Sequence, residues 1–319
     1  MKEHTTPLVI IAGPTAVGKT QLSIALAKAI GGEIISADSM QVYRHMNIGS
    51  AKVTKESMQG IPHHLIDILE PTESFDVVLF AKLAKEAITE IRKRNHIPIL
   101  VGGTGFYIQA VLYDIDFTEQ MADVTVREQL NQLATTKGNR YLHEALQRVD
   151  EVSAANIHEN NVKRVIRALE FNYLTGQKIS EHNEIEHKKK SCYAYHYFVI
   201  TDDRATLYAK INQRVDEMMQ EGLLEEVQQM LALGCVHDSV SMQGLGYKQL
   251  LNYLAGECTL EEAVCAIKQE TRHFAKRQLT WFRRESEAVW IDKRTYQHQD
   301  ILMIHEMIKQ IQEHEHEHQ

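Results

Sequence analysis

A short apolar run near the start of the chain passes directly into a glycine-rich turn. Leu8 to Ala12 is followed by Gly13-Pro14-Thr15-Ala16-Val17-Gly18-Lys19-Thr20, which matches the P-loop pattern G-x-x-x-x-G-K-[ST]. Gln21 to Ile30 then carries apolar residues at helical spacing. This order of strand, loop and helix predicts the first unit of an α/β domain with a parallel sheet.

The chemistry of the turn favours a phosphate ligand. Glycines let successive N–H groups point inward, and the following helix presents its positive end. Lys19 adds a charge, and the Thr20 hydroxyl is a ligand for Mg²⁺. We therefore expect residues 13–20 to bind a di- or triphosphate together with Mg²⁺. The turn alone leaves open whether that phosphate is hydrolysed, transferred or expelled.

Two further apolar segments predict parallel strands that end beside the P-loop. Glu33 to Ala37 delivers Asp38, a carboxylate placed to accept a proton, to hold the metal, or to cap the following turn. Ile97 to Val101 runs into Gly102-Gly103-Thr104-Gly105. The Thr104 hydroxyl suits a diphosphate oxygen, although close packing of a helix on the strand explains the glycines equally well.

Two motifs of nucleotide-hydrolysing P-loop proteins are missing from the sequence. The strand Ile97 to Val101 ends in glycine rather than in an acid that holds Mg²⁺ and orients water. The base-recognition motif N-K-x-D is absent as well. Both absences disfavour a motor or a GTPase switch.

The distribution of proline divides the chain. All 5 prolines lie before residue 99, and most of the remainder has helical periodicity. Amphipathic segments follow from about Asp116, until Tyr195 to Ile200 predicts a strand that returns to the sheet. We therefore expect a P-loop NTPase-like parallel sheet flanked by helices, formed by residues 1–115 and 196–319, with a helical insertion domain at 116–195.

The insertion contains a helical segment, Asn161 to Leu174, with a basic flank. Its predicted buried stripe consists of Val162, Ile166, Leu169 and Tyr173. Its flank consists of Lys163, Arg164 and Arg167. Such a flank suits the phosphates of an RNA backbone and is equally typical of a solvated helix face.

The segment Ala263 to Arg284 is the most asymmetric helix of the sequence. Ile267, Phe274 and Trp281 recur every seven residues as a predicted buried seam. The other faces carry Glu270 and the bases Lys268, Arg272, Lys276, Arg277, Arg283 and Arg284. On a chain of net charge -8 this local excess is typical of binding to a nucleic-acid backbone, with a solvated charged face as the alternative.

Two segments between these helices carry further candidates. Leu207 to Leu233 predicts a long helix punctuated by Gly222 and Gly234, with Arg214 beside its apolar stripe. Ser241 to Lys248 is a glycine-containing turn with an aromatic residue and a base. Its composition suits a nucleotide contact and equally an ordinary connector.

Composition and cysteine usage fit a protein of a reducing compartment. Hydrophobic residues make up 44% and charged residues 24%, and neither a secretory signal nor a membrane-length apolar run is evident. We therefore expect a cytoplasmic location. Cys192, Cys235, Cys258 and Cys265 lack zinc-type spacing, which predicts free thiols. The end, Glu313 to Gln319, alternates acid and imidazole and predicts a disordered, solvated tail.

Five motifs together resemble those of the tRNA dimethylallyltransferase family, in the family's order and over nearly the whole chain. They are residues 13–20, Ser36-Ala37-Asp38-Ser39-Met40-Gln41-Val42-Tyr43, Pro98 to Gly105, Arg164 to Glu170, and Ala275 to Arg283. The resemblance implies transfer of a dimethylallyl group from its diphosphate to the exocyclic amine of the adenine just after the anticodon. The tRNAs would be those that read codons beginning with U, and diphosphate would leave.

The resemblance also implies roles for individual residues. Asp38 would be the general base, and Thr104 would touch the bridging oxygen of the diphosphate. Lys19, Thr20 with Mg²⁺, and Arg214 would neutralise the departing charge. Contacts to the tRNA anticodon stem-loop would come from Asp38, Ser39, Met40, Gln41, Arg127, Lys163, Arg164, Val165, Ile166, Arg167, Gln243, Gly244, Gly246, Tyr247 and Lys248. The basic helix adds Arg272, Lys276 and Arg277 to this surface.

The sequence departs from the family pattern at two positions. Glu159 stands where proline is usual, and Phe106 replaces a common leucine. The zinc finger of some eukaryotic members is absent, which indicates a bacterial-type protein, and we expect a monomer. The alternatives are a small-molecule or nucleoside kinase, an isopentenyltransferase acting on free AMP, and an RNA-binding module without catalysis.

Overall fold

The computed structural model of the protein describes residues 6–115, 124–187 and 189–317. The chain divides into two compact units, Met1–Val111 with Tyr193–Gln319, and Leu112–Cys192. The larger unit contains a six-stranded sheet in the order β3-β2-β4-β1-β5-β6. Its strands are β1 (Leu8–Ala12), β2 (Gly32–Ala37), β3 (His63–His64), β4 (Ile97–Gly102), β5 (Tyr195–Thr201) and β6 (Val289–Asp292). Every pair is parallel, which confirms the predicted α/β class.

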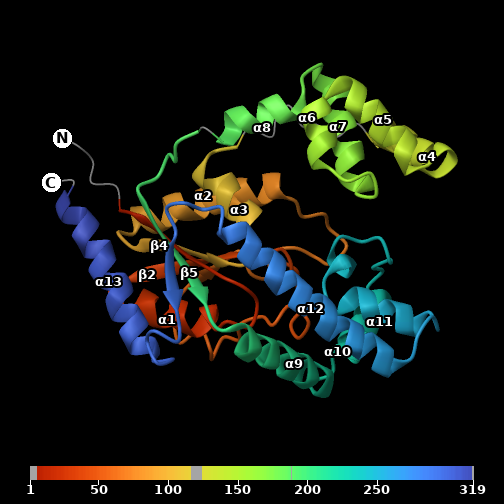
Figure 1. Cartoon of the computed structure of the whole chain (residues 1–319). Coiled ribbons are helices and arrows are strands. Elements are labelled where there is room, and N and C mark those ends of the chain that lie inside the picture. Colours follow the sequence, from red (N-terminus) through yellow and green to blue (C-terminus); the bar gives the residue numbers. More distant parts are fainter. Residues whose placement is uncertain (1–5, 116–123, 188, 318–319) are drawn as a thin grey trace. The chain divides into compact units, whose positions relative to one another are not determined.

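Helices cover both faces of this sheet (Figure 1). Helices α1 (Lys19–Ile30) and α13 (Asp300–Glu317) lie on one face, and α2 (Val77–Lys93) and α3 (Gly105–Leu112) lie on the other. Strands covered on both sides need apolar residues at every position. The fully buried run of β1 meets that need, and it is the same run that makes the P-loop strand recognisable in the sequence.

The carboxyl ends of three neighbouring strands lie level with one another. Gly102 of β4 pairs with Ala12 of β1 on one side and with Ala37 of β2 on the other. Neighbouring strands are about 4.8 Å apart, so the turns that follow them start side by side. This register brings the P-loop, Asp38 and the Gly103–Thr104 turn to one edge of the sheet.

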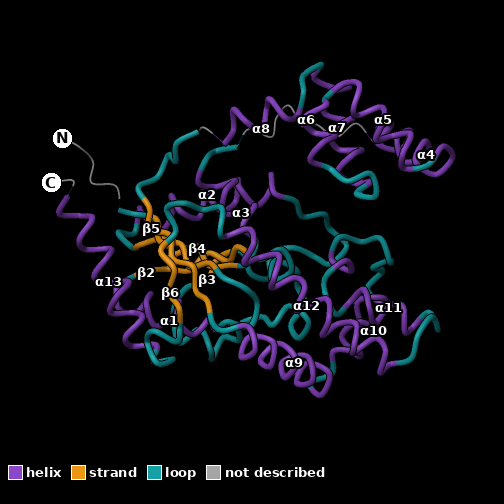
Figure 2. Tube along the Cα trace, viewed as in Figure 1, coloured by secondary structure: helices purple, strands orange, loops and turns teal. Residues whose placement is uncertain are grey.

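The connection from residue 38 to residue 62 contains no helix or strand (Figure 2). Non-glycine residues adopt positive φ at His45 (65°), Ala51 (47°) and Gln59 (52°). Side chains disfavour this left-handed region, so each such residue costs conformational energy. A connection of this kind keeps its shape only where other parts of the fold hold it.

The second half of the larger unit is helical. Its elements are α9 (Arg204–Gln220), α10 (Leu223–Ala232), the 3₁₀ turn η2 (Ser241–Gln243), α11 (Tyr247–Leu254) and α12 (Leu260–Phe282). The single helix predicted for Leu207 to Leu233 is wrong, because Gly222 has a φ of 100° and a right-handed helix cannot continue through it. Leu231, expected inward, is 38% exposed.

Two further predictions about helices need correction. In α12 the predicted seam holds at Ile267, but Phe274 and Trp281 are only half-buried, and the buried positions are Ala263, Ile267, Ala275, Gln278 and Phe282. The heptad spacing misses these because a straight helix buries residues every 3.6 positions. The expected disordered tail is also wrong as far as Glu317, where α13 ends; the last two residues lie outside the described part.

The smaller unit is a set of helices with a core of its own. They are α4 (Val124–Lys137), α5 (Asn139–Val149), α6 (Glu151–Asn156), α7 (Val162–Thr175) and α8 (Ile179–His187). Leu142 and Leu146 of α5 pack with Val165 and Ile166 of α7. Tyr173 does not belong to the buried stripe of α7, because it is 73% exposed, and Phe171 is buried instead.

The two ends of the smaller unit meet. The N–H of Cys192 donates to the carbonyl oxygen of Leu112 at 3.2 Å. All four cysteines are free thiols, as predicted. Within the described ranges, no helix is both long and apolar enough to cross a bilayer.

A buried carboxylate connects the amino ends of the neighbouring strands β2, β3 and β4. Glu33 of β2 is 2% exposed and accepts two hydrogen bonds from Arg94, at 2.9 and 2.7 Å. His64 and His96 each lie 2.7 Å from one of its oxygens. The Arg94 hydrogen bond, against the opposing effect of burial, lowers the pKa of Glu33 to about 2.

We predict that Glu33→Gln lowers the free energy of unfolding by about 1–3 kcal/mol near pH 7, because a charged acceptor with several donors is lost. The folded pKa lies below the ordinary value of 4.5. The stabilisation is therefore complete above that value and is lost as pH falls toward about 2. Urea unfolding at several pH values measures it. Glu90→Gln, which breaks the exposed Glu90–Lys93 pair, is the control, and equal effects of the two variants would contradict the prediction.

Candidate active site

A cavity of about 470 Å³ lies in the larger unit at the carboxyl ends of β1, β2 and β4. Its wall includes the P-loop, the residues that follow β2 and β4, the segment 49–53, and residues of α9 and α12. Parallel α/β sheets bind their ligands at this edge. The position of the cavity therefore agrees with the phosphate site expected from the sequence.

The backbone of the P-loop is bent in a way that requires glycine. Gly13 and Gly18 have φ values of 149° and 94°, and a Cβ on Gly13 would lie 2.5 Å from the carbonyl oxygen of Ile200. Helix α1 begins at Lys19, so its positive end faces the turn. Thr15, Ala16, Gly18, Lys19 and Thr20 line the cavity. The predicted residue Val17 instead packs into the core.

Two cations and a carboxylate share the cavity. Lys19 Nζ donates to the carbonyl oxygens of Gly13 and Pro14, at 2.9 and 2.8 Å. Burial lowers the pKa of Lys19 to about 8, with the nearby Asp38 raising it and Arg214 lowering it. Arg214 comes from α9, lines the same cavity, and also has its pKa lowered by burial. A site of this kind attracts an anion, since a bound anion relieves the repulsion between the cations.

Asp38 caps a turn and also faces the cavity. Its Oδ1 accepts hydrogen bonds from the N–H groups of Met40 and Gln41, at 2.8 and 3.3 Å. The capping role considered for Asp38 is therefore real. Both bonds use the same oxygen, which leaves Oδ2 of this cavity-lining carboxylate for a substrate.

The glycines after β4 are required by close packing. Added Cβ atoms would lie 2.2 Å from Ala37 O at Gly102, 2.1 Å from Gln278 Nε2 at Gly103, and 2.1 Å from Trp281 Cδ1 at Gly105. Thr104 lies between them and lines the cavity. Packing thus accounts for the glycines, and it leaves the threonine beside the P-loop for chemistry.

Gln278 of α12 connects the two glycine turns. Its Oε1 accepts the N–H of Thr15 at 2.9 Å, and its Nε2 donates to the carbonyl oxygen of Gly103 at 3.0 Å. The N–H of Thr15 is thus engaged by the protein. Sequence reasoning missed this residue, although it lies inside the motif Ala275 to Arg283.

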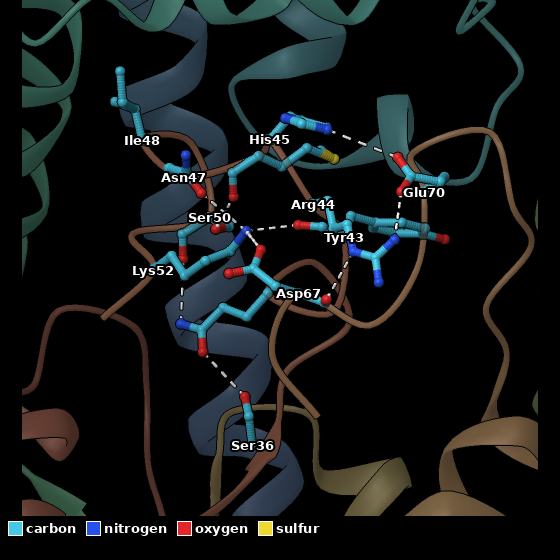
Figure 3. Close-up of polar contacts among 12 residues, drawn as sticks. Ser36, Tyr43, Arg44, His45, Asn47, Ile48, Ser50, Lys52, Asp67 and Glu70 are labelled. Atoms are coloured by element: carbon cyan, nitrogen blue, oxygen red, sulfur yellow. Dashed lines mark hydrogen bonds and ion pairs between the residues drawn. The ribbon is translucent and has the colours of Figure 1, made fainter. Parts of the chain in front are cut away.

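Lys52 holds the irregular connection after β2 (Figure 3). Its side chain is 4% exposed, and its ammonium donates to the carbonyl oxygen of Tyr43 at 2.6 Å. It also contacts Asn47 Oδ1 at 3.0 Å and Asp67 Oδ1 at 2.5 Å. One buried charge thus joins two parts of the connection, at Tyr43 and Asn47, to Asp67 beyond β3.

Glu226 of α10 holds the same connection from outside. Its carboxylate accepts the N–H groups of Asn47, Ile48 and Gly49 at 2.7 to 3.0 Å, and the Tyr247 hydroxyl at 2.5 Å. Burial and the Glu226 charge raise the pKa of Tyr247, so its hydroxyl keeps its proton and donates. No sequence pattern singled out Glu226, because adjacent glutamates in a helix normally indicate a solvated face.

The two segments predicted to contact RNA in the larger unit meet at the cavity. Ser39, Met40 and Gln41 line it together with Gln243, Gly244 and Gly246. A Cβ on Gly244 would lie 2.8 Å from Met40 Sδ, so the two segments touch. Tyr247 is buried against Glu226, and the exposed Lys248 does not line the cavity.

The basic residues of α12 serve different purposes. Arg277 lines the cavity, and Lys276 is exposed. Arg272 donates to Asn212 Oδ1 at 2.6 Å, and Lys268 pairs with Asp216 at 2.6 Å. Part of the predicted basic surface therefore fastens α12 to α9.

The predicted RNA-contact residues of the smaller unit fall into three groups. Arg127 and Arg167 pair with Glu170, which is completely buried, at 2.8 and 2.9 Å. Val165 and Ile166 belong to the core, whereas Lys163 and Arg164 are exposed. Glu170 thus orients Arg127 of α4 and Arg167 of α7, and the exposed bases Lys163 and Arg164 also belong to α7.

The donor set suits a magnesium ion held mainly by its phosphate ligand. In the described residues no group of three or more His, Cys, Asp or Glu side chains is placed to hold a metal. The Thr20 hydroxyl and the Asp38 carboxylate both line the cavity. Mg²⁺ prefers oxygen ligands and commonly uses few protein groups with substrate phosphates and waters, so these residues fit it.

Comparisons with known proteins agree on one family. A family model described as IPP transferase matches residues 41–285. A tRNA dimethylallyltransferase of Lachnoclostridium phytofermentans is 56% identical over 309 residues, covering 97% of this chain and 98% of that protein. The crystal structure of the full-length tRNA isopentenylpyrophosphate transferase from Bacillus halodurans is similar with a TM-score of 0.74 and 43% identity, over 98% of this chain and 100% of that one.

A more distant enzyme shares the fold. A eukaryotic dimethylallyltransferase, captured acting on tRNA, is similar with a TM-score of 0.76 and 31% identity, over 89% of this chain and 73% of that chain. These similarities agree with the site, in which two glycine turns and a carboxylate lie at one edge of the sheet. The chain belongs to the IPP transferase family, together with the tRNA dimethylallyltransferases.

Proposed function

We propose that the protein transfers a dimethylallyl group from dimethylallyl diphosphate to the exocyclic amine of the adenine after the anticodon, in tRNAs that read U-initial codons. The observation that carries the proposal is the single cavity lined by the P-loop, by the cations Lys19 and Arg214, and by the carboxylate Asp38. The P-loop and the two cations suit a diphosphate, and the Asp38 carboxylate suits an attacking amine.

The P-loop side of the cavity would stabilise the leaving group. As the allylic carbon–oxygen bond breaks, positive charge grows on carbon and negative charge grows on the diphosphate. Lys19 and Arg214 line the cavity beside the positive end of α1, where they would face that negative charge, and preorganised groups of this kind lower the barrier most. The Thr104 hydroxyl would donate to the bridging oxygen. Mg²⁺ held at Thr20 would supply further charge neutralisation.

Asp38 would receive the proton of the amine. An adenine amine stacked inside an anticodon loop cannot reach a buried cavity, so the base must be flipped out. Two backbone N–H groups hold Asp38 Oδ1 in place. The carboxylate therefore keeps its orientation, and Oδ2 would accept the proton without rearrangement of another residue. Ser39, Met40, Gln41, Gln243, Gly244, Gly246 and Arg277 would surround the flipped base.

The anticodon stem-loop would be gripped by basic residues outside the cavity. Lys276 and Lys248 in the larger unit and Lys163 and Arg164 in the smaller unit are exposed bases suited to phosphates. Arg127 and Arg167 would contribute in the orientation that Glu170 imposes on them.

The proposal is tested by supplying radiolabelled dimethylallyl diphosphate with undermodified tRNA, with AMP, or with neither. We expect label in tRNA and not in AMP, with one diphosphate released for each group transferred. Labelled AMP would indicate an isopentenyltransferase that acts on free AMP. Incubation with γ-labelled ATP and nucleosides tests the kinase alternative. The structure disfavours a kinase, because no acid that could hold the metal follows β4.

We predict that Asp38→Asn lowers kcat by roughly a hundred-fold or more, as expected for loss of a general base. Asparagine keeps the oxygen that caps the turn, so tRNA affinity should change little. Single-turnover transfer and filter binding measure the two quantities. Asp203→Asn is the matched control, because Asp203 Oδ1 also accepts two backbone N–H groups but lies outside the cavity. Unchanged turnover in Asp38→Asn would remove this residue from the mechanism.

We predict that Lys19→Met weakens the binding of inorganic diphosphate by roughly 10- to 100-fold at pH 7, the usual range for a charged hydrogen-bond donor. The difference from wild type should shrink as pH rises through about 8, because the wild-type ammonium then loses its proton. Calorimetric titration from pH 7 to higher values measures both effects. Lys28→Met, the same change at an exposed position of α1, should bind like wild type at every pH. A pH-independent difference would contradict the prediction.

A further inference from the structure

We propose that Gln278 is a positioning residue for the transfer reaction, which sets the spacing between the P-loop and Thr104. The inference rests on the proposed function, because it assigns those two turns to opposite parts of one diphosphate. Gln278 lies on α12, more than 170 residues from either turn in sequence, and only 6% of its side chain is exposed.

The chemistry of the amide matches the two turns in one orientation only. Thr15 offers a backbone N–H and Gly103 offers a backbone carbonyl oxygen, so the bridging side chain must accept at one end and donate at the other. Glutamine carries one acceptor and one donor group at that separation. An apolar side chain at this position would leave both backbone groups without their protein partner.

The sheet alone does not control this spacing. Strand pairing fixes Ala12 against Gly102, but both turns leave the ladder directly after those residues. Thr15 is the third residue beyond β1, and Thr104 is the second beyond β4. Gln278 joins the two turns beyond the last residues that strand pairing holds. Gly103 and Gly105, where a Cβ would lie 2.1 Å from Gln278 and Trp281, let α12 approach closely enough.

Correct spacing matters while the carbon–oxygen bond lengthens. The Thr104 hydroxyl would keep its hydrogen bond to the bridging oxygen as that oxygen moves away from carbon. The P-loop would hold the terminal phosphate oxygens. A misplacement of about 1 Å between groups that act together costs on the order of a hundred-fold in rate. Gln278 lines the cavity as well, but its amide atoms are already occupied by Thr15 and Gly103, so its effect passes through the two turns.

The test compares Gln278→Met, Gln278→Glu and the control Gln269→Met in the full-length chain. Methionine removes both hydrogen bonds at nearly constant volume, and Gln269 is an exposed glutamine on the same helix. We expect Gln278→Met to lower kcat at saturating substrates by roughly 10- to 100-fold. The KM for tRNA should stay that of wild type, and Gln269→Met should behave as wild type in every respect.

Gln278→Glu supplies a readout that a purely structural role would not move. A protonated carboxyl has the shape of the amide, with a carbonyl to accept from Thr15 and an O–H to donate to Gly103. The ionised form instead sets an oxygen anion against the Gly103 carbonyl. The kcat of Gln278→Glu relative to wild type should therefore rise as pH falls, whereas the same ratio for Gln278→Met should stay flat.

Circular dichroism melting of each variant accompanies the kinetics, so that rates are compared on folded protein. Transfer by Gln278→Met as fast as by Gln269→Met, or a pH-independent ratio for Gln278→Glu, would overturn the inference and leave the proposed function intact. Wild-type protein that releases no diphosphate and labels no tRNA would instead contradict the proposed function itself. Slow Gln278→Met with pH-dependent recovery in Gln278→Glu would establish the positioning role.

Discussion

The register at the carboxyl ends of β1, β4 and β2 is the constraint on which the rest of the site depends. Gly102 pairs with Ala12 and with Ala37 at once, so three turns leave the sheet level with one another. A side chain at Gly102 would strike the carbonyl oxygen of Ala37, so the glycine lets the ends of β4 and β2 approach each other closely. The P-loop, the Asp38 carboxylate and Thr104 lie together because the ends of these three strands are aligned.

Buried polar side chains, one from within the connection and others from distant helices, then hold the turns that follow the strands. The connection after β2 contains left-handed residues and no regular structure, yet Lys52 inside it and Glu226 outside it satisfy its backbone groups. Buried charged groups are costly unless fully hydrogen-bonded, and both of these are well supplied with partners. The resulting stiffness keeps Asp38 aimed into the cavity, although it lies in the least regular part of the fold.

Local sequence patterns were enough to predict the turns of the site that directly follow a strand. The P-loop, the strands β1, β2 and β4, Asp38 and Thr104 lie within short motifs whose apolar run, glycines and polar residue are adjacent in sequence. Gln278, Glu226 and Lys52 escaped because their roles depend on partners that only the folded chain brings near. The errors of periodicity at Tyr173 and Trp281 had another origin, because spacing along the sequence does not show which side of a helix meets a partner. The cytoplasmic location and the monomeric state stay predictions.

The hydrogen bond between Cys192 N–H and Leu112 O has a consequence for how such proteins diversify. Since the helical unit leaves and rejoins the chain at neighbouring points, its length and content are free to vary without altering any strand pairing. Insertions or deletions within the smaller unit would therefore leave the aligned strand ends of the larger unit intact.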